Sequence, residues 1–168
     1  LQALLGQRVA TSILQPKVLE KALKTADVVI GAISSSVGRA PIVVTEDMVS
    51  KMKDFSVIVD VSIDKGGCIE TSDVTSHDAP IFSKYGVIHY CVPNIASRVA
   101  RTASYALSNV ITPTILDTGE FGGLEVMIKS YLGIQNGVYI YKGVLTNKYL
   151  AETFGLPYKD INLLLMAM

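Results

Sequence analysis

The sequence lacks an excess of charge of either sign, because fifteen lysines and arginines balance fifteen aspartates and glutamates among its 168 residues. A balanced chain offers no basic footprint for nucleic acid and no electrostatic attraction to a charged bilayer. It also lacks any apolar run near the roughly 20 residues that a membrane span needs. We therefore expect neither a nucleic-acid partner nor a membrane partner.

Several motifs with known chemistry are missing as well. No G-x-G-x-x-G turn and no P-loop occurs, so these residues contain no phosphate-cradling turn. No G-x-S-x-G nucleophile elbow occurs, and His77 and His89 stand apart from both cysteines, so no metal site is expected. Cys68 and Cys91 could form a disulfide, but two cysteines in such a chain favour reduced, buried thiols and a cytoplasmic protein.

Apolar residues are what the chain has in quantity. Hydrophobic residues make up 49% and charged residues 18%, enough for one domain with a sizeable core, or for one domain and part of another. The chain opens at Leu1 without an initiator methionine, in an apolar segment that resembles the end of a helix. We expect a piece of a longer protein, or a processed one.

Short apolar runs alternate with amphipathic segments over residues 9–92. Strand patterns cover residues 8–12, 27–33, 56–63 and 87–92, and helical patterns follow Pro16 and Thr45. Strands separated by helices predict parallel βαβ units, so the expected class is α/β. The stretch 64–86 looks irregular.

The last third of the chain follows a different pattern. Asn94 is placed as an N-cap, and an apolar stripe from Ile95 to Val110 predicts a helix that ends near Asn109. From Thr112 onward the pattern predicts short helices and turns without a comparable buried strand. This segment is expected to pack on a second domain.

Residues 57–68 carry most of the functional signal. Their apolar, β-branched start is typical of a strand buried on both faces, and the chain then presents Asp64 beside Gly66 and Gly67. In open α/β sheets the ligand crevice lies just outside the carboxyl ends of the strands. Asp64 is therefore a candidate ligand-facing group, and a solvated aspartate at the start of a loop is the alternative.

Several blocks of the sequence, in order, resemble the family of alanine dehydrogenases and the related alpha subunits of nicotinamide nucleotide transhydrogenase. The blocks are residues 26–32, 39–41, 44–49, 53, 57–72, 75–78, 87–95 and 100–109. The resemblance covers most of 8–112 and extends more loosely to Leu156. Residues 63–68 are similar to the dehydrogenase branch, because the transhydrogenase branch carries Glu in place of Asp64 and Asn in place of Cys68.

The resemblance implies a partial Rossmann-type parallel sheet with helices and a helical C-terminal segment. Residues 1–110 would be the later part of an NAD-binding domain, and 111–168 would belong to the substrate domain. The intact parent would be an NAD-dependent, homo-oligomeric alanine dehydrogenase that converts L-alanine reversibly to pyruvate and ammonia, and this piece alone would be inactive. The alternatives are a transhydrogenase alpha subunit and a non-catalytic dinucleotide-binding protein.

The resemblance also assigns roles to residues. Asp64 would lie at the nicotinamide and the substrate as an acid/base or orienting group. Asn94 would contact the nicotinamide region, which is compatible with its role as an N-cap. The implied cofactor-binding set runs beside the adenosine and then along the nicotinamide: Ile33, Ser34, Val61, Ser62, Ile63, Asp64, Val92, Asn94 and Ile95. Asp73-Val74 departs from Arg-Pro and Leu14 departs from Ser, which weakens two expected cofactor contacts.

Overall fold

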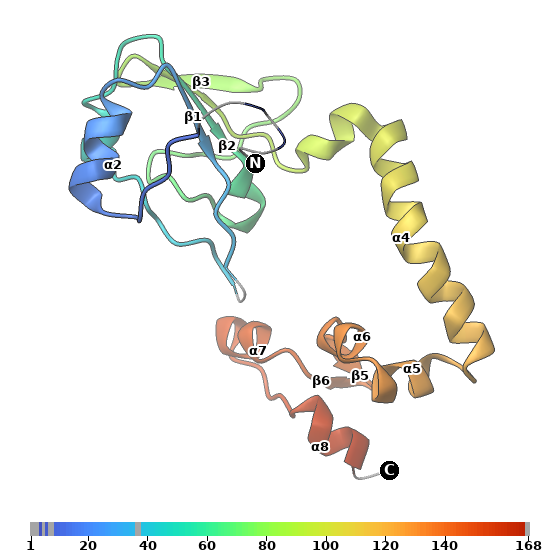
Figure 1. The fold of residues 1–168 in the computed structure, drawn as a ribbon. Helices are drawn as coiled ribbons and strands as arrows, with labels where there is room; N and C mark the ends of the chain where they lie inside the picture. The colour runs from blue at the N-terminus through green and yellow to red at the C-terminus, as the bar shows by residue number, and fades with distance from the viewer. Residues whose placement is uncertain (1–3, 5, 7–8, 36–37, 167–168) are drawn as a thin grey trace. The chain divides into compact units, whose positions relative to one another are not determined.

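A computed structural model describes residues 4, 6, 9–35 and 38–166. The chain divides into two compact units, Leu1–Ile95 and Ala96–Met168. These N-terminal and C-terminal units run from blue to green and from yellow to red in Figure 1. The division falls before the long helix that follows Ile95, whereas the sequence places the domain boundary at residue 110. The domain assignment within a longer parent stays a prediction.

A four-stranded sheet organises the N-terminal unit, in the order β1-β2-β4-β3. The register pairs Val28 with Val57 and Val57 with Ile88, so β1, β2 and β4 run parallel, while β3 is antiparallel to β4. This arrangement confirms the predicted α/β class with a parallel sheet. The strands are β1 (Val28–Gly31), β2 (Val57–Asp60), β3 (Ile81–Lys84) and β4 (Val87–Tyr90).

Two helices contribute to the core of this unit, namely α2 (Pro16–Leu23) and α3 (Glu46–Val49). Pro16 opens α2, where its missing N–H costs nothing, and the Thr45 hydroxyl caps α3 by accepting the Met48 N–H. The core includes Leu23, Val49 and Ile58.

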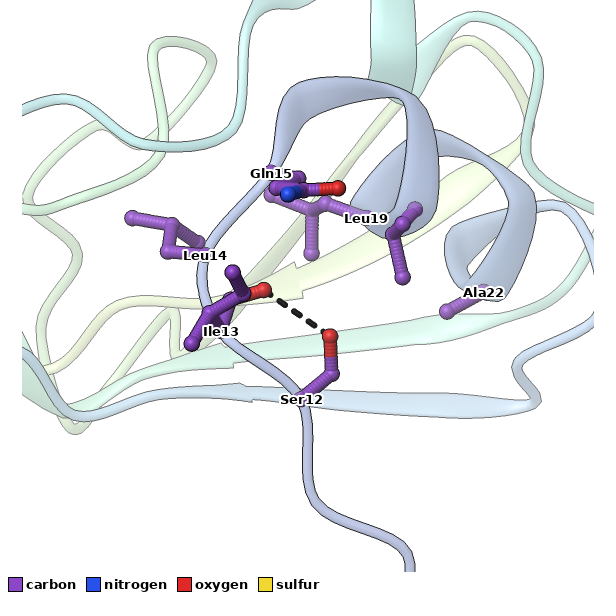
Figure 2. A pocket seen from close by; sticks show the side chains of 7 residues that line it. Ser12, Ile13, Leu14, Gln15, Leu19 and Ala22 are labelled. Carbon is purple, nitrogen blue, oxygen red and sulfur yellow. Dashed lines mark hydrogen bonds between the residues drawn. The ribbon is translucent and has the colours of Figure 1, made fainter.

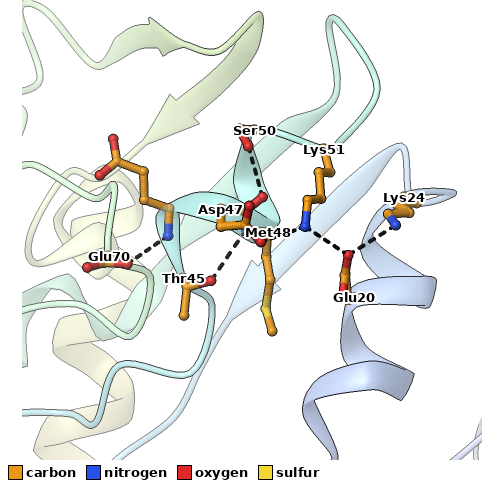
Figure 3. Close-up of polar contacts among 9 residues, drawn as sticks. Glu20, Lys24, Thr45, Asp47, Met48, Ser50, Lys51 and Glu70 are labelled. Atoms are coloured by element: carbon orange, nitrogen blue, oxygen red, sulfur yellow. Dashed lines mark hydrogen bonds and ion pairs between the residues drawn. The ribbon is translucent and has the colours of Figure 1, made fainter.

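An exposed ion-pair network connects α2 to α3 (Figure 3). The Lys51 ammonium lies 3.2 Å from the Glu20 carboxylate and 2.6 Å from that of Asp47. The partially exposed position of all three side chains means that solvent screens these pairs. Apolar burial therefore contributes more than these charges to holding the two helices together.

Three strand predictions in this unit are wrong. A strand was predicted over residues 8–12, of which Arg8 lies outside the described residues. Residues 9–12 form no strand, because a strand needs a hydrogen-bonded neighbour and residues 10–12 are exposed. The strand predicted over 56–63 ends at Asp60, where the chain turns into the 3₁₀ helix η1 (Val61–Lys65). The irregular stretch 64–86 contains β3, an edge strand that is only half covered and therefore lacks a long apolar run.

Helices dominate the C-terminal unit. The helix predicted to end near Asn109 begins as the 3₁₀ helix η2 (Ile95–Val99) and continues as α4 (Ala100–Glu120). The predicted end near Asn109 is wrong, because α4 continues through Pro113. The helix is exposed there, so the carbonyl that proline leaves without a helical donor can face solvent.

The rest of this unit consists of short elements: α5 (Leu124–Ser130), α6 (Leu132–Asn136), β5 (Ile140–Tyr141), β6 (Val144–Leu145), α7 (Lys148–Phe154) and α8 (Ile161–Met166). The pair β5–β6 is a hairpin whose turn residues Lys142 and Gly143 both have positive φ. Met127, Ile128 and Tyr141 are buried in this unit. Among the described residues, no helix is both long and apolar enough to cross a bilayer.

His89 lies fully buried in β4, in the core of the N-terminal unit. Its Nδ1 is 3.0 Å from the Val87 carbonyl, which can only accept, so Nδ1 carries the proton. Nε2 then accepts a 2.8 Å hydrogen bond from the Thr71 hydroxyl, and the ring stacks on Phe82. Burial is the main reason that the pKa of His89 is lower than its usual value.

This lowered pKa predicts a loss of stability in acid. Below about pH 6.5 the unfolded chain binds a proton at His89 that the folded chain still excludes. The stabilisation is complete above that pH and is lost as the pH falls toward the folded pKa. We expect His89→Gln to flatten the dependence of the urea midpoint on pH between about 7.5 and 5.5. A slope in His89→Gln equal to that of the wild type would contradict the assignment.

Candidate functional site

The carboxyl ends of β1, β2 and β4 lie at one edge of the sheet, because these strands are parallel neighbours. The polypeptide leaves this edge through residues 32–35, 61–65 and 91–95. Ligands of open α/β sheets bind outside such an edge. Every residue predicted for the site lies on one of these three segments.

Asp60, the last residue of β2, fixes the second of these segments, residues 61–65, by hydrogen bonds. Its side chain is buried, with 2% of the residue exposed. Oδ1 accepts the Ser62 N–H at 2.9 Å, and Oδ2 accepts the Cys68 N–H at 3.0 Å and the Ser72 hydroxyl at 2.7 Å. In the sequence, Asp60 is indistinguishable from the polar end of a strand pattern. Its place directly after Val57–Val59 is the one signal of a buried carboxylate, because such a group is buried only where hydrogen-bond donors satisfy it.

Ser62 connects the first segment to the second. Its buried hydroxyl accepts the Ile33 N–H at 2.8 Å and donates to the Ile33 carbonyl, also at 2.8 Å. Two hydrogen bonds to one residue fix the backbone where the chain leaves β1. The predicted site residues Ile33 and Ser62 are thus in direct contact, although the serine hydroxyl is used within the protein.

Asp64 connects the second segment to the third. It is exposed on η1, and its Oδ1 accepts the backbone N–H of Asn94 at 2.8 Å. Among the described residues, its Oδ2 has no hydrogen-bond partner. Asn94 has a φ of +51° and directly precedes η2, but the N-cap of the long helix α4 is Val99, so the N-cap role predicted for Asn94 is wrong. The structure therefore brings Asp64 and Asn94 together and leaves one carboxylate oxygen open to solvent.

Lys65 and Arg39 brace the same turns from outside. The Lys65 ammonium donates to the Ser34 hydroxyl at 2.9 Å, and the Arg39 guanidinium donates to the Gly66 carbonyl at 2.9 Å. Ser34, a predicted cofactor contact, is exposed beside this lysine. Neither cation was predicted as part of the site, because a basic residue in such a loop carries no distinctive sequence pattern.

The remaining predicted site residues contribute surface and packing. Val61 and Ile95 are 39% and 38% exposed, whereas Ile63 and Val92 are buried. Exposed apolar side chains at the sheet edge can form a dry wall for a planar ligand. Ile63 and Val92 could contribute only backbone groups.

Both cysteines are free and buried, so the expectation of reduced thiols holds for these residues. Burial is the leading cause that raises the pKa of the Cys68 and Cys91 thiols. The Cys68 Sγ lies 3.7 Å from Asp60 Oδ1, and a nearby carboxylate also disfavours a thiolate. The Cys68 thiol is therefore a weak donor to Asp60, and neither cysteine is placed as a nucleophile.

A separate hollow of about 190 Å³ lies beside the start of α2 (Figure 2). It contains none of the predicted site residues, but Leu14, where the resemblance expects serine, is part of its lining. The Ser12 hydroxyl donates to the neighbouring Ile13 carbonyl at its rim. The lining is mainly apolar: Ser12, Ile13, Leu14, Gln15, Val18, Leu19 and Ala22.

The parallel sheet and the polar turns at its carboxyl edge define an open α/β domain of the ligand-binding type. The family described as "Alanine dehydrogenase/PNT, C-terminal domain" matches residues 1–148. The chain belongs to this family.

Known proteins agree with that assignment. "Alanine dehydrogenase 2" from Staphylococcus aureus strain USA300 is 43% identical over 162 residues, which cover 96% of this chain and 43% of the relative. The protein of the same name from strain N315 gives the same values. The chain thus spans less than half the length of these curated relatives.

Solved structures show the same relationship. An L-alanine dehydrogenase superposes with a TM-score of 0.78 and 34% identity, over 92% of this chain and 42% of that one. A transhydrogenase from Sinorhizobium meliloti superposes with a TM-score of 0.60 and 26% identity, over 75% and 34% of the two chains. The fold is therefore that of alanine dehydrogenase.

The neighbouring glycines of this site provide a test of the Asp60 contacts. Both have positive φ, but a Cβ on Gly67 would lie 2.9 Å from the buried Asp60 Oδ2, whereas one on Gly66 would meet the exposed Arg39 side chain. A Cβ on Gly66 would lie 2.6 Å from Arg39 Nε, but that exposed side chain can move aside, so we expect Gly66→Ala to lower the free energy of unfolding by about 1–2 kcal/mol, mainly through backbone strain. Gly67→Ala should cost about 1–3 kcal/mol more, because Asp60 must move away from its donors. Equal losses in urea unfolding of the two variants would contradict this.

Proposed function

We propose that this chain is part of an NAD-dependent alanine dehydrogenase, whose intact form converts L-alanine reversibly to pyruvate and ammonia. The observation that carries the proposal is the exposed Asp64 carboxylate at the carboxyl end of β2, held by the Asn94 amide at the exit of β4. A carboxylate at this edge is placed to face a ligand. The chain's relatives supply the reaction, and Asp64 supplies a group that can take part in it.

The residues at this edge fit one part of a dinucleotide. Ile33 and Ser34 would lie beside its adenosine side, and Val61, Asn94 and Ile95 would line the nicotinamide with Asp64. Three features of this edge suit such a ligand. Ser62 and Asp60 fix the backbone, Val61 and Ile95 expose apolar surface, and one oxygen of the Asp64 carboxylate is open. Ser62, Ile63 and Val92 would contribute backbone groups and rigidity.

The nicotinamide held at this edge would supply the acceptor for the hydride that leaves the Cα of alanine. Asp64 would take a proton from the water that attacks the resulting imine carbon and return it to the nitrogen as ammonia leaves, which is general acid–base catalysis. The backbone N–H of Asn94 would hold the other carboxylate oxygen and so orient the Asp64 side chain. Residues at the edge would exclude bulk water from one side of the reacting groups.

The dehydrogenase branch is favoured over the transhydrogenase branch by two residues. Asp64 and Cys68 stand where the resemblance expects Glu and Asn in transhydrogenase alpha subunits. The 43% identity to "Alanine dehydrogenase 2" and the 26% identity to the transhydrogenase structure point the same way. Transhydrogenase and a non-catalytic dinucleotide-binding protein are the competing outcomes.

Further properties of the intact protein are proposed on the same basis. They are L-alanine and pyruvate as substrates, a homo-oligomeric state and a cytoplasmic location. The 168 residues alone are expected not to turn over alanine, because they span 43% of the length of the relatives. Alanine-dependent reduction of NAD by these residues alone would contradict that expectation.

The catalytic role of Asp64 predicts a selective loss. In the intact protein, Asp64→Asn should lower kcat for alanine oxidation by about 10²- to 10⁴-fold, because the amide cannot exchange a proton as a carboxylate does. Binding of NAD, measured by calorimetry, should be retained. Asp47→Asn removes a carboxylate that pairs with Lys51 on α3 and should leave both quantities unchanged.

Normal turnover of the Asp64→Asn protein would remove the role assigned to this carboxylate. Intact wild-type protein that binds NAD without oxidising alanine would instead favour the transhydrogenase or non-catalytic alternative.

A further inference from the structure

We propose that Asp60 is a positioning residue that holds Asp64 in place at the edge of the sheet, an inference that rests on the function proposed for Asp64. The two aspartates are four residues apart but have opposite environments. Asp60 is buried and surrounded by donors, whereas Asp64 is exposed and open to a ligand. The first fixes the backbone that carries the second.

The donors to Asp60 come from both ends of the turn that carries Asp64. The Ser62 N–H lies before Asp64, and the Cys68 N–H and the Ser72 hydroxyl lie after it. One buried carboxylate therefore closes residues 61–68 into a loop. Hydrogen bonds to an ionised acceptor are stronger than neutral ones, and water cannot easily replace them in a buried place.

The packing around Asp60 leaves little room for another arrangement. Gly67 has a φ of +77°, and a Cβ there would lie 2.9 Å from Asp60 Oδ2. A Cβ on Gly31, at the end of β1, would lie 3.2 Å from Asp60 Oδ1. Both glycines let the backbone approach the carboxylate, and a side chain at either position would displace it.

Asp60 itself is not placed to react. Both of its oxygens are occupied by donors from within the protein, and the residue is buried. The effect of Asp60 on catalysis therefore passes through Asp64. The backbone N–H of Asn94 donates to Asp64 Oδ1 at 2.8 Å. The hydrogen exchange rate of this N–H therefore reports whether Asp64 keeps its position.

The first experiment follows that reporter by hydrogen–deuterium exchange and mass spectrometry of the intact protein. Asp60→Asn replaces an acceptor by a donor, and Ser72→Ala removes one donor with a milder change. In both, exchange in peptides spanning residues 91–96 should rise by about tenfold, as for loss of one charge-assisted hydrogen bond. Asp64→Ala gives the exchange rate of residues 91–96 when the hydrogen bond between Asp64 and Asn94 is completely lost. Exchange in peptides from β2 reports the stability of the sheet.

The matched control is Ser50→Ala, which removes a hydroxyl that donates to the Asp47 carbonyl on α3. It should leave residues 91–96 unchanged. The proposal is overturned if the exchange of residues 91–96 stays at the wild-type value in Ser72→Ala, or rises only together with that of β2. Ser72→Ala decides the question alone if Asp60→Asn does not fold.

The second experiment measures turnover. Asp60→Asn and Ser72→Ala should lower kcat by about 10- to 100-fold, with the KM for NAD within about threefold of the wild type. In the Asp64→Asn background the same changes should lower the remaining rate less than about threefold, because they act through Asp64. Equal losses in both backgrounds would overturn the proposal.

The two failures are distinguishable. If Asp64→Asn retains full activity, the function proposed for Asp64 fails, while the exchange data still judge whether Asp60 positions it. If Asp64→Asn loses activity but the exchange of residues 91–96 does not respond to Ser72→Ala, only the positioning role fails.

Discussion

The buried carboxylate of Asp60 is the constraint on which the rest of the site depends. It has no cationic partner among the described residues, and hydrogen-bond donors at Ser62, Cys68 and Ser72 compensate its burial instead. The hydrogen bonds to Asp60 stabilise the turn at which β2 ends and η1 begins. The Ser62 hydroxyl bonds to Ile33, and the Asp64 carboxylate bonds to Asn94. Two side chains on the turn that Asp60 fixes therefore join the three strand exits.

The sequence predicts the three parallel strands because their evidence is local. Apolar, β-branched runs such as Val57–Val59 are typical of strands, and helices between such runs favour parallel pairing. The end of β2 could not be predicted in the same way, since it depends on donors eight and twelve residues farther along the chain. Residues 9–12 failed for a related reason: a β-branched run predicts a strand but supplies no neighbour for it.

The candidate site was predictable in part. Asp64 follows from its place after a buried strand, and the resemblance to a family gives it a chemical role. Asp60 was missed because a strand pattern tolerates one polar residue at its end, and only three-dimensional contacts distinguish a solvated aspartate from a buried one. The contact between Asp64 and Asn94 joins residues thirty positions apart, and no periodicity predicts it. Family membership, in turn, supplies the reaction, which neither the sheet nor its edge determines.

The central claim is that the loop closed by Asp60 presents Asp64 to the reacting atoms of an amino acid beside a nicotinamide ring. The most direct test is a crystal structure of the intact protein with NAD and pyruvate. We predict that a carboxylate oxygen of Asp64 lies within about 2.6–3.2 Å of pyruvate or of one bridging water, with the Asn94 contact retained. An Asp64 side chain that points away from the nicotinamide, with Asp60 still bonded to its three donors, would contradict the account.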